Sequence, residues 1–231
     1  MDMERGLYIA ASGMLSEQVR QDLLANDLAN ASTPGYKADR ATQREFEEML
    51  LSNTRTGAGI GSLGQGVAID RQATDWRPQA MRQTDEPLDF AIEGEGFFAV
   101  QGPGGVGYTR NGRFSAAPDG RLVTATGETV LGRNGAPVRV GADGTVAPQA
   151  LQVVLLQNPR KAGEGLVTGQ PAGQAPLDAV RSGALEGSGA DPARAMVDMI
   201  ASMRAFESGQ RVIRTIDDTL GKAVNEVGVV R

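Results

Sequence analysis

Residues 191–227 read DPARAMVDMIASMRAFESGQRVIRTIDDTLGKAVNEV, and this stretch carries the clearest periodic pattern in the chain. A capping acid and a proline open it, as at many helix starts. Alternating steps of three and four then predict a long helix that packs along a partner in a left-handed supercoil. The seam positions are Met196, Met199, Met203, Phe206, Gln210, Ile213, Asp217, Leu220, Val224 and Val227.

Two of these positions are polar, Gln210 and Asp217. A buried polar seam residue fixes register and partner number at a cost in stability. The other interpretation is that both side chains lie at a solvated edge, and the sequence leaves both open.

A second helix is predicted over residues 4–30, ending near Asn30 and the segment Thr33-Pro34-Gly35. Its repeating face is only weakly apolar because small and amide side chains separate the larger ones. This face is too thin to cover the C-terminal seam, so part of the seam is expected to meet other chains. The face consists of Leu7, Ala11, Met14, Gln18, Gln21, Ala25 and Leu28.

The middle of the chain, residues 66–181, is predicted to be β structure with many tight turns. Short strand-like runs alternate with four Asn-Gly or Asp-Gly pairs, which favour antiparallel hairpins. Residues 38–52 could form a short helix, residues 57–66 a glycine-rich bend, and residues 161–190 a loop. The pairs are Asn111-Gly112, Asp119-Gly120, Asn134-Gly135 and Asp143-Gly144.

Composition argues against several functional classes. The 23 basic and 28 acidic residues are mixed along the chain, so no basic patch favours nucleic acid. No apolar run approaches the roughly 18 residues of a membrane span, and the N-terminus lacks the pattern of a cleaved secretory signal. The chain has no cysteine and no histidine, which removes thiolate ligands and the commonest general base.

Two local patterns could carry chemistry, and both are better explained structurally. Residues 59–64 match G-x-G-x-x-G, but a dinucleotide site needs a strand before it and a helix after it; here the predicted order is reversed. Glu93 and Glu95 could act as paired carboxylates, yet a solvated turn is the simpler interpretation. We therefore expect no enzyme activity, cofactor, metal or small-molecule substrate.

Three ordered segments resemble one protein family. They are ANDLANASTPGYKADR at 25–40, DFAIEGEGFFAV at 89–100 with the continuation over 108–132, and MIASMRAFESGQRVIRTIDDTLGKAV at 199–224. They are similar to segments of bacterial flagellar rod and hook axial proteins, although Asp27, Met203, Phe206 and Gly209 depart from the usual pattern. The N-terminal signature comprises Asn26, Leu28, Ala29, Asn30, Thr33, Gly35, Tyr36 and Lys37.

The resemblance implies an α+β fold in which the N- and C-terminal helices pair as a coiled-coil-like axial domain beside an antiparallel β-rich middle domain. The implied division is 1–36 for the N-terminal axial helix and signature, 37–75 for a connector, 76–186 for the β-rich domain and 187–231 for the C-terminal helix.

The resemblance also implies a function: a structural subunit of the flagellar basal-body rod that transmits torque. Such a subunit leaves the cytoplasm through the flagellar export apparatus without a cleaved signal peptide, and it assembles helically in the cell envelope with copies of itself and neighbouring rod or hook subunits. The segment 62–92 is similar to both proximal and distal rod proteins. The alternatives are a hook or hook-associated component, and a non-flagellar coiled-coil binding module.

The predicted assembly seam combines both helices. It consists of Leu7, Met14, Leu28, Met196, Met199, Met203, Phe206, Ile213, Leu220 and Val224.

Overall fold

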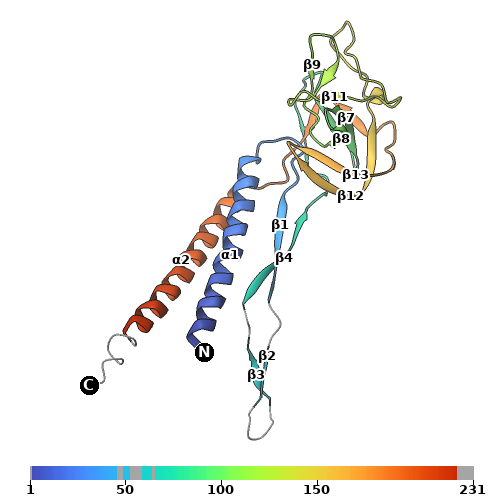
Figure 1. Ribbon diagram of the computed structural model, residues 1–231. Helices are drawn as coiled ribbons and strands as arrows, with labels where there is room; N and C mark the ends of the chain where they lie inside the picture. The colour runs from blue at the N-terminus through green and yellow to red at the C-terminus, as the bar shows by residue number, and fades with distance from the viewer. Residues whose placement is uncertain (1, 46–48, 53–58, 64–65, 223–231) are drawn as a thin grey trace, which may run out of the picture. The chain divides into compact units, whose positions relative to one another are not determined.

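A computed structural model describes residues 2–45, 49–52, 59–63 and 66–222 of the 231-residue chain (Figure 1). The chain divides into two compact units. The helical unit contains residues 1–28, 39–73 and 192–231, and the β unit contains residues 29–38 and 74–191. The chain therefore crosses between the units several times, and residues 29–38 of the signature region belong to the β unit.

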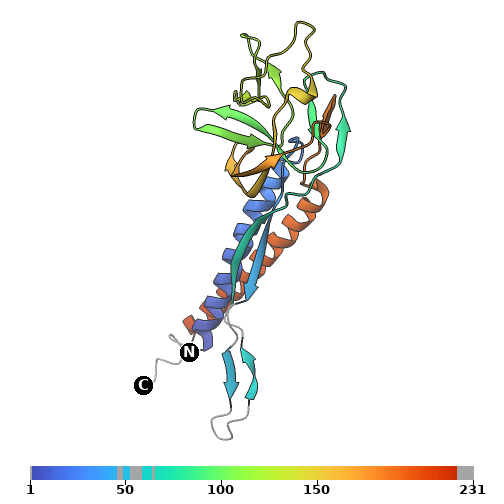
Figure 2. The same cartoon turned by 90° about the vertical axis from the view of Figure 1, so that its right-hand side faces the viewer.

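The helical unit contains two long helices and two β-hairpin segments. Figures 1 and 2 both show the helices α1 and α2 side by side. Strand β1 pairs with β4, and β2 pairs antiparallel with β3. The elements are α1 (Asp2–Ala29), β1 (Asp39–Glu45), β2 (Met49–Ser52), β3 (Gly59–Leu63), β4 (Val67–Thr74) and α2 (Pro192–Lys222).

Both predicted helices are confirmed, whereas two predictions for the segment between α1 and β4 are wrong. The suggested helix over 38–52 is replaced by β1 and β2, because strand pairing outweighs the weak local preference of a polar segment. Part of the expected glycine-rich bend is strand β3. The predicted seam positions Val224 and Val227 lie outside the described residues.

The β unit is built around a seven-stranded sheet with the order β12-β13-β8-β7-β11-β10-β9. Strand β12 also pairs with β7, so β7, β8, β13 and β12 form a closed ring. The predicted antiparallel β-rich middle is thus confirmed. The elements are β5 (Met81–Gln83), β6 (Phe90–Ile92), β7 (Phe97–Gly102), β8 (Gly105–Thr109), β9 (Ser115–Ala116), β10 (Leu122–Val123), β11 (Thr129–Val130), η1 (Pro148–Ala150), β12 (Val153–Gly163), β13 (Leu166–Gln174), β14 (Val180–Ser182) and β15 (Ala184–Glu186).

The loop predicted over residues 161–190 is wrong, because most of that segment is strand. Strands β12 and β13 form a long hairpin, and β14 and β15 pair with β6 and β5. Register shifts between Leu155 and Leu156 and between Gln157 and Arg160 show how the hairpin accommodates a sequence rich in Gly, Ala and Pro.

Three of the four predicted turns are confirmed, at Asp119-Gly120, Asn134-Gly135 and Asp143-Gly144, whose glycines have positive φ angles; Asn111-Gly112 is not a turn, although it shares one hydrogen bond with the others. In all four pairs, the Asn or Asp side-chain oxygen accepts from the backbone N–H two residues later. The turn at Asp119-Gly120 connects the paired strands β9 and β10.

The core of the β unit holds three phenylalanines in ring contact, Phe90, Phe98 and Phe114. A second cluster places Trp76 edge-on to Phe97 with ring centroids 5.7 Å apart. Neither helix among the described residues has the length and apolar character needed to cross a membrane.

Candidate functional sites: the helix pair and a buried ion cluster

Helices α1 and α2 contact each other in an antiparallel arrangement. The Ser202 hydroxyl donates to the carbonyl oxygen of Glu17 over 3.2 Å. Nearer the C-terminal end of α1, a carboxylate oxygen of Asp198 lies 4.0 Å from a guanidinium nitrogen of Arg20. Towards the other end, a Cβ built on Gly6 would lie 3.3 Å from Ile216.

Small residues of α2 occupy the most buried positions of this contact. Ala195 and Ser202 are buried, and Gly209 sits so close to α1 that an added Cβ would lie 2.7 Å from Met14. The least exposed stripe follows alternating steps of four and three. It contains Ala195, Met199, Ser202, Phe206, Gly209, Ile213, Ile216 and Leu220.

This stripe differs from the predicted seam at every second position. Met199, Phe206, Ile213 and Leu220 are half-buried and occur in both. At the other four positions, the helix pair uses the residue one place earlier. The predicted positions left outside the stripe are Met196, Met203, Gln210 and Asp217, of which Gln210 is half-buried and the others exposed.

A second face of α1 lies against the β1–β4 strand pair. The Ser12 hydroxyl accepts from the backbone N–H of Val67 over 3.3 Å. Asp27 accepts from the backbone N–H of Asp39 over 3.4 Å, and Ser16 between them is buried. Helix α1 is therefore covered on two sides, and its buried residues are divided between two faces. This is why the single face predicted from the sequence is only weakly apolar. The predicted residues Leu7, Met14 and Leu28 are half-buried.

The outer faces of both helices expose large apolar side chains. On α1, Tyr8, Leu15 and Val19 fall within about 40° of one another at 100° per residue, with exposures of 73%, 65% and 40%. On α2, Met196, Ile200 and Met203 fall within about 60° and are each about half exposed. We call these two stripes the outer apolar face.

In the β unit, three charged side chains meet in the interior. The Lys37 ammonium lies 2.7 Å from Glu186 Oε1, and the Arg110 Nε donates to Glu186 Oε2. All three side chains are less than 5% exposed. Removing one member of such a buried group leaves a charge without its partner, which is strongly destabilising.

Backbone groups complete this ion cluster. Lys37 also donates to the Arg77 carbonyl over 2.7 Å, and the Gln79 N–H donates to Glu186 Oε1 over 2.7 Å. The remaining N–H groups of Arg110 bind the carbonyl oxygens of Ile92, Gly94 and Gly96. Burial lowers the pKa of Lys37 from its ordinary value of 10.5, and the hydrogen bond and charge of Glu186 partly oppose this shift.

The N-terminal signature supplies one cluster member and docks around it. Gly35 has a φ of 67° and fits against the Arg110 carbonyl, where a side chain would collide. The Ser188 hydroxyl donates to the Asn30 carbonyl over 2.9 Å, and Lys161 lies 4.4 Å from the centre of the Tyr36 ring. The Thr33 hydroxyl bonds to the Asn30 side chain, Leu28 is half-buried, and Asn26 and Ala29 are exposed.

Sequence reasoning missed Arg110 and Glu186. Arg110 lies inside a segment quoted for its family resemblance, but nothing local marks it as buried. Glu186 falls in the stretch predicted to be a loop, so its burial on β15 had no sequence signal.

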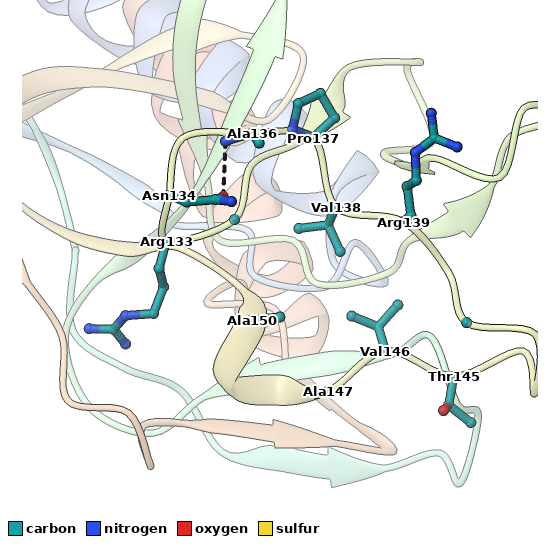
Figure 3. Close-up of a pocket in the computed structure, with 12 residues that line it drawn as sticks. Arg133, Asn134, Ala136, Pro137, Val138, Arg139, Thr145, Val146, Ala147 and Ala150 are labelled. Atoms are coloured by element: carbon teal, nitrogen blue, oxygen red, sulfur yellow. Dashed lines mark hydrogen bonds between the residues drawn. The ribbon is translucent and has the colours of Figure 1, made fainter.

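The patterns considered for chemistry lie apart from this cluster. Glu93 is exposed and pairs with Arg181 over 2.9 Å, and Glu95 is exposed in the same bend. Residues 59–63 are paired strand, which does not form a phosphate-binding loop. A shallow hollow of about 530 Å³ lies over η1, with Val138 and Val146 at its floor and Arg133 and Arg139 at its rim (Figure 3).

Comparison with known proteins gives three matches in the order of the chain. Residues 7–37 match the family described as Flagella basal body rod protein, residues 91–154 the Flagellar hook protein FlgE/F/G D1 domain, and residues 181–226 the Flagellar basal body rod FlgEFG protein C-terminal. The flagellar basal-body rod protein FlgF of Escherichia coli (strain K12) is 35% identical, over 96% of this chain and 97% of its own length. The chain belongs to the flagellar basal-body rod protein family.

Other relatives in this family align over nearly the full chain. FlgF of Rhizobium meliloti (strain 1021) is 31% identical, over 98% of this chain and 99% of the relative. FlgG of Bacillus subtilis (strain 168) is 29% identical, over 96% of this chain and 99% of the relative. The sequence-based resemblance is therefore confirmed, and the chain is a structural rod protein of the flagellum. Each of the three matched regions contributes one residue to the ion cluster: Lys37, Arg110 and Glu186.

Proposed function

We propose that this rod-family chain assembles helically with copies of itself and with neighbouring rod or hook subunits in the basal body, and that the assembly transmits torque. The outer apolar face supports this proposal most directly. Tyr8, Leu15, Ile200 and Met203 expose large apolar surfaces on two long helices, and such surfaces mark interaction sites. The occupant that we propose for this face is the helix pair of a second subunit.

The predicted seam fits this proposal as a shared surface. Met196 and Met203 are half exposed and belong to the outer apolar face, while Phe206 and Ile213 are half-buried and belong to the least exposed stripe of α2. Contacts that repeat head to tail generate open helical assemblies. In this proposal the chain leaves the cytoplasm through the flagellar export apparatus, and it has a structural role with no catalysis.

Motility tests the proposed surface. Ile200→Glu would place a charge in the outer apolar face of α2, so we expect rod assembly and swimming to be lost. Val212→Glu is the matched control, because Val212 is 47% exposed on α2 but lies roughly 120° away from Ile200 around the helix. Normal swimming of the Ile200→Glu strain would refute this assembly surface.

Isolated basal bodies test the location. We expect the chain to co-purify with basal bodies that contain a rod but lack a hook, and its gene deletion to leave a partial rod. Co-purification only with structures that carry a hook would instead support a hook component.

A further inference from the structure

Two chain segments far apart in sequence are joined by a very short backbone pairing in the β unit. The Gly35 N–H donates to the Glu186 carbonyl over 3.0 Å, and the Gly189 N–H donates to the Tyr36 carbonyl over 2.8 Å. These two bonds align the signature segment 35–37 with residues 186–189. Three of the residues involved in this stretch are glycines (Gly35, Gly187 and Gly189), and a pairing rich in glycine specifies its register weakly.

The ion cluster supplies the missing specificity. We propose that Lys37, Glu186 and Arg110 form a register lock that permits only one alignment of segment 35–37 with segment 186–189. A slip of one residue moves Lys37 along the chain by roughly 3.3–3.6 Å, beyond the reach of its 2.7 Å contact with Glu186. Lys37 then loses Glu186 and remains a buried cation without a partner carboxylate. An apolar side chain at position 37 carries no comparable penalty in the slipped alignment.

The receiving half of the lock is built within the β unit. Arg110 is held by the carbonyl oxygens of Ile92, Gly94 and Gly96. Glu186 is held by Arg110 and by the Gln79 N–H, and its strand pairs with β5. These contacts do not involve the signature segment, so they hold the carboxylate independently of Lys37.

Lysine suits the remaining space because its ammonium is a compact charge. Lys37 has two acceptors at 2.7 Å, one from Glu186 and one from the Arg77 carbonyl. The Lys37 ammonium therefore depends on acceptors from two separate parts of the chain. This makes Lys37 a positioning residue for the alignment of segment 35–37 with segment 186–189.

Fluorine NMR on the full chain tests this register lock. Trp76 is the only tryptophan and lies next to Arg77, so 5-fluorotryptophan gives one probe beside the cluster. We expect one folded resonance for the unaltered chain and at least two slowly exchanging folded resonances for Lys37→Met. The matched control is Lys161→Met, because Lys161 touches the ring of the neighbouring Tyr36 from outside the cluster; one resonance is expected there.

A reversible crosslink identifies the cause of any extra resonance. The chain has no cysteine, and Ser188 bonds to the backbone of Asn30, so Asn30→Cys with Ser188→Cys reports the native alignment. In the Lys37→Met chain, oxidation should restore one resonance and reduction should split it again. If Lys37→Met does not fold, Lys37→Met/Glu186→Gln, which leaves no carboxylate in the cluster, is measured in the same way. A single folded resonance without the crosslink, several resonances that persist with it, or failure of both variants to fold would each overturn the proposal.

Discussion

Gly209 of α2 lies directly against Met14 of α1, and a Cβ added at Gly209 would lie 2.7 Å from Met14 Cγ. Gly209 has no side chain, so the Met14 side chain packs directly against the backbone of α2 at this point. The carbonyl oxygen of Ala10 would also lie within 3.8 Å of that added atom. The helix contact therefore depends on the absence of a side chain at position 209.

Replacing Gly209 tests this close approach. Alanine stabilises a helix interior by roughly 0.5–1 kcal/mol relative to glycine, but overpacking costs about 1–3 kcal/mol. We expect Gly209→Ala to give no net gain and Gly209→Val to destabilise the helix pair. Gly13→Ala is the control, because nothing lies within 4 Å of its added Cβ, and it should stabilise α1. Amide hydrogen exchange in α1 and α2 measures each change, and equal stabilisation by both alanines would contradict the prediction.

The hydrogen bond from Ser202 to Glu17 gives a second prediction for the helix pair. Ser202 is 1% exposed, so Ser202→Ala should lose a buried bond worth about 0.5–1.5 kcal/mol. Ser202→Leu should lower the stability further, because the larger side chain does not fit between the two helices. Ser208→Ala changes an exposed serine on the same helix and should stay within about 0.5 kcal/mol. Thermal unfolding followed by helical circular dichroism compares the three variants, and a neutral Ser202→Leu would show that the pair is loosely packed.

Periodicity predicted where the helices lie, and half of the predicted assembly seam on α2 also belongs to the stripe between the helices. A hydrophobicity pattern selects Met196 and Met203, whereas a close helix contact selects the small residues Ala195 and Ser202. Side-chain size, which such a pattern ignores, decides which face turns inward when backbones approach.

The ion cluster could not be predicted from local patterns at all. Lys37 and Glu186 are 149 residues apart in sequence, and Arg110 and Glu186 are 76 apart. Each residue alone looks like an ordinary surface charge, and only the tertiary fold brings them together. The turns were predictable because an Asn or Asp side chain bonds to its own backbone two residues away.

Gly35 and Gly135 allow backbone strain to be separated from steric collision. Their φ angles are 67° and 74°, but only Gly35 faces a carbonyl oxygen, that of Arg110. Gly135→Ala should therefore cost only about 1–2 kcal/mol of backbone strain. Gly35→Ala adds a collision with the main chain and should cost about 2–5 kcal/mol in total. Urea unfolding followed by Trp76 fluorescence measures both, and equal costs would show that the signature segment moves aside freely.

Glu128 predicts how the stability of the β unit depends on pH. Burial alone would raise the pKa of Glu128, but hydrogen bonds from the hydroxyls of Thr124 and Thr126 and from its own backbone N–H hold the pKa below the ordinary 4.5. Between the folded and ordinary pKa values, the unfolded chain binds a proton that the folded chain does not. The stabilisation is therefore complete above about pH 4.5 and is lost as the pH falls through the folded pKa.

Comparing Glu128→Gln with the unaltered chain isolates this contribution. We expect the variant to be less stable by about 1–2 kcal/mol near pH 7, because it lacks charge-assisted bonds, and the difference to shrink towards about pH 3. Glu95→Gln is the control, since Glu95 is exposed and its substitution should stay within about 0.5 kcal/mol at pH 7. Urea unfolding at several pH values gives both differences. A gap between Glu128→Gln and the unaltered chain that stays constant down to pH 3 would show that the carboxylate does not stabilise the fold through its charge.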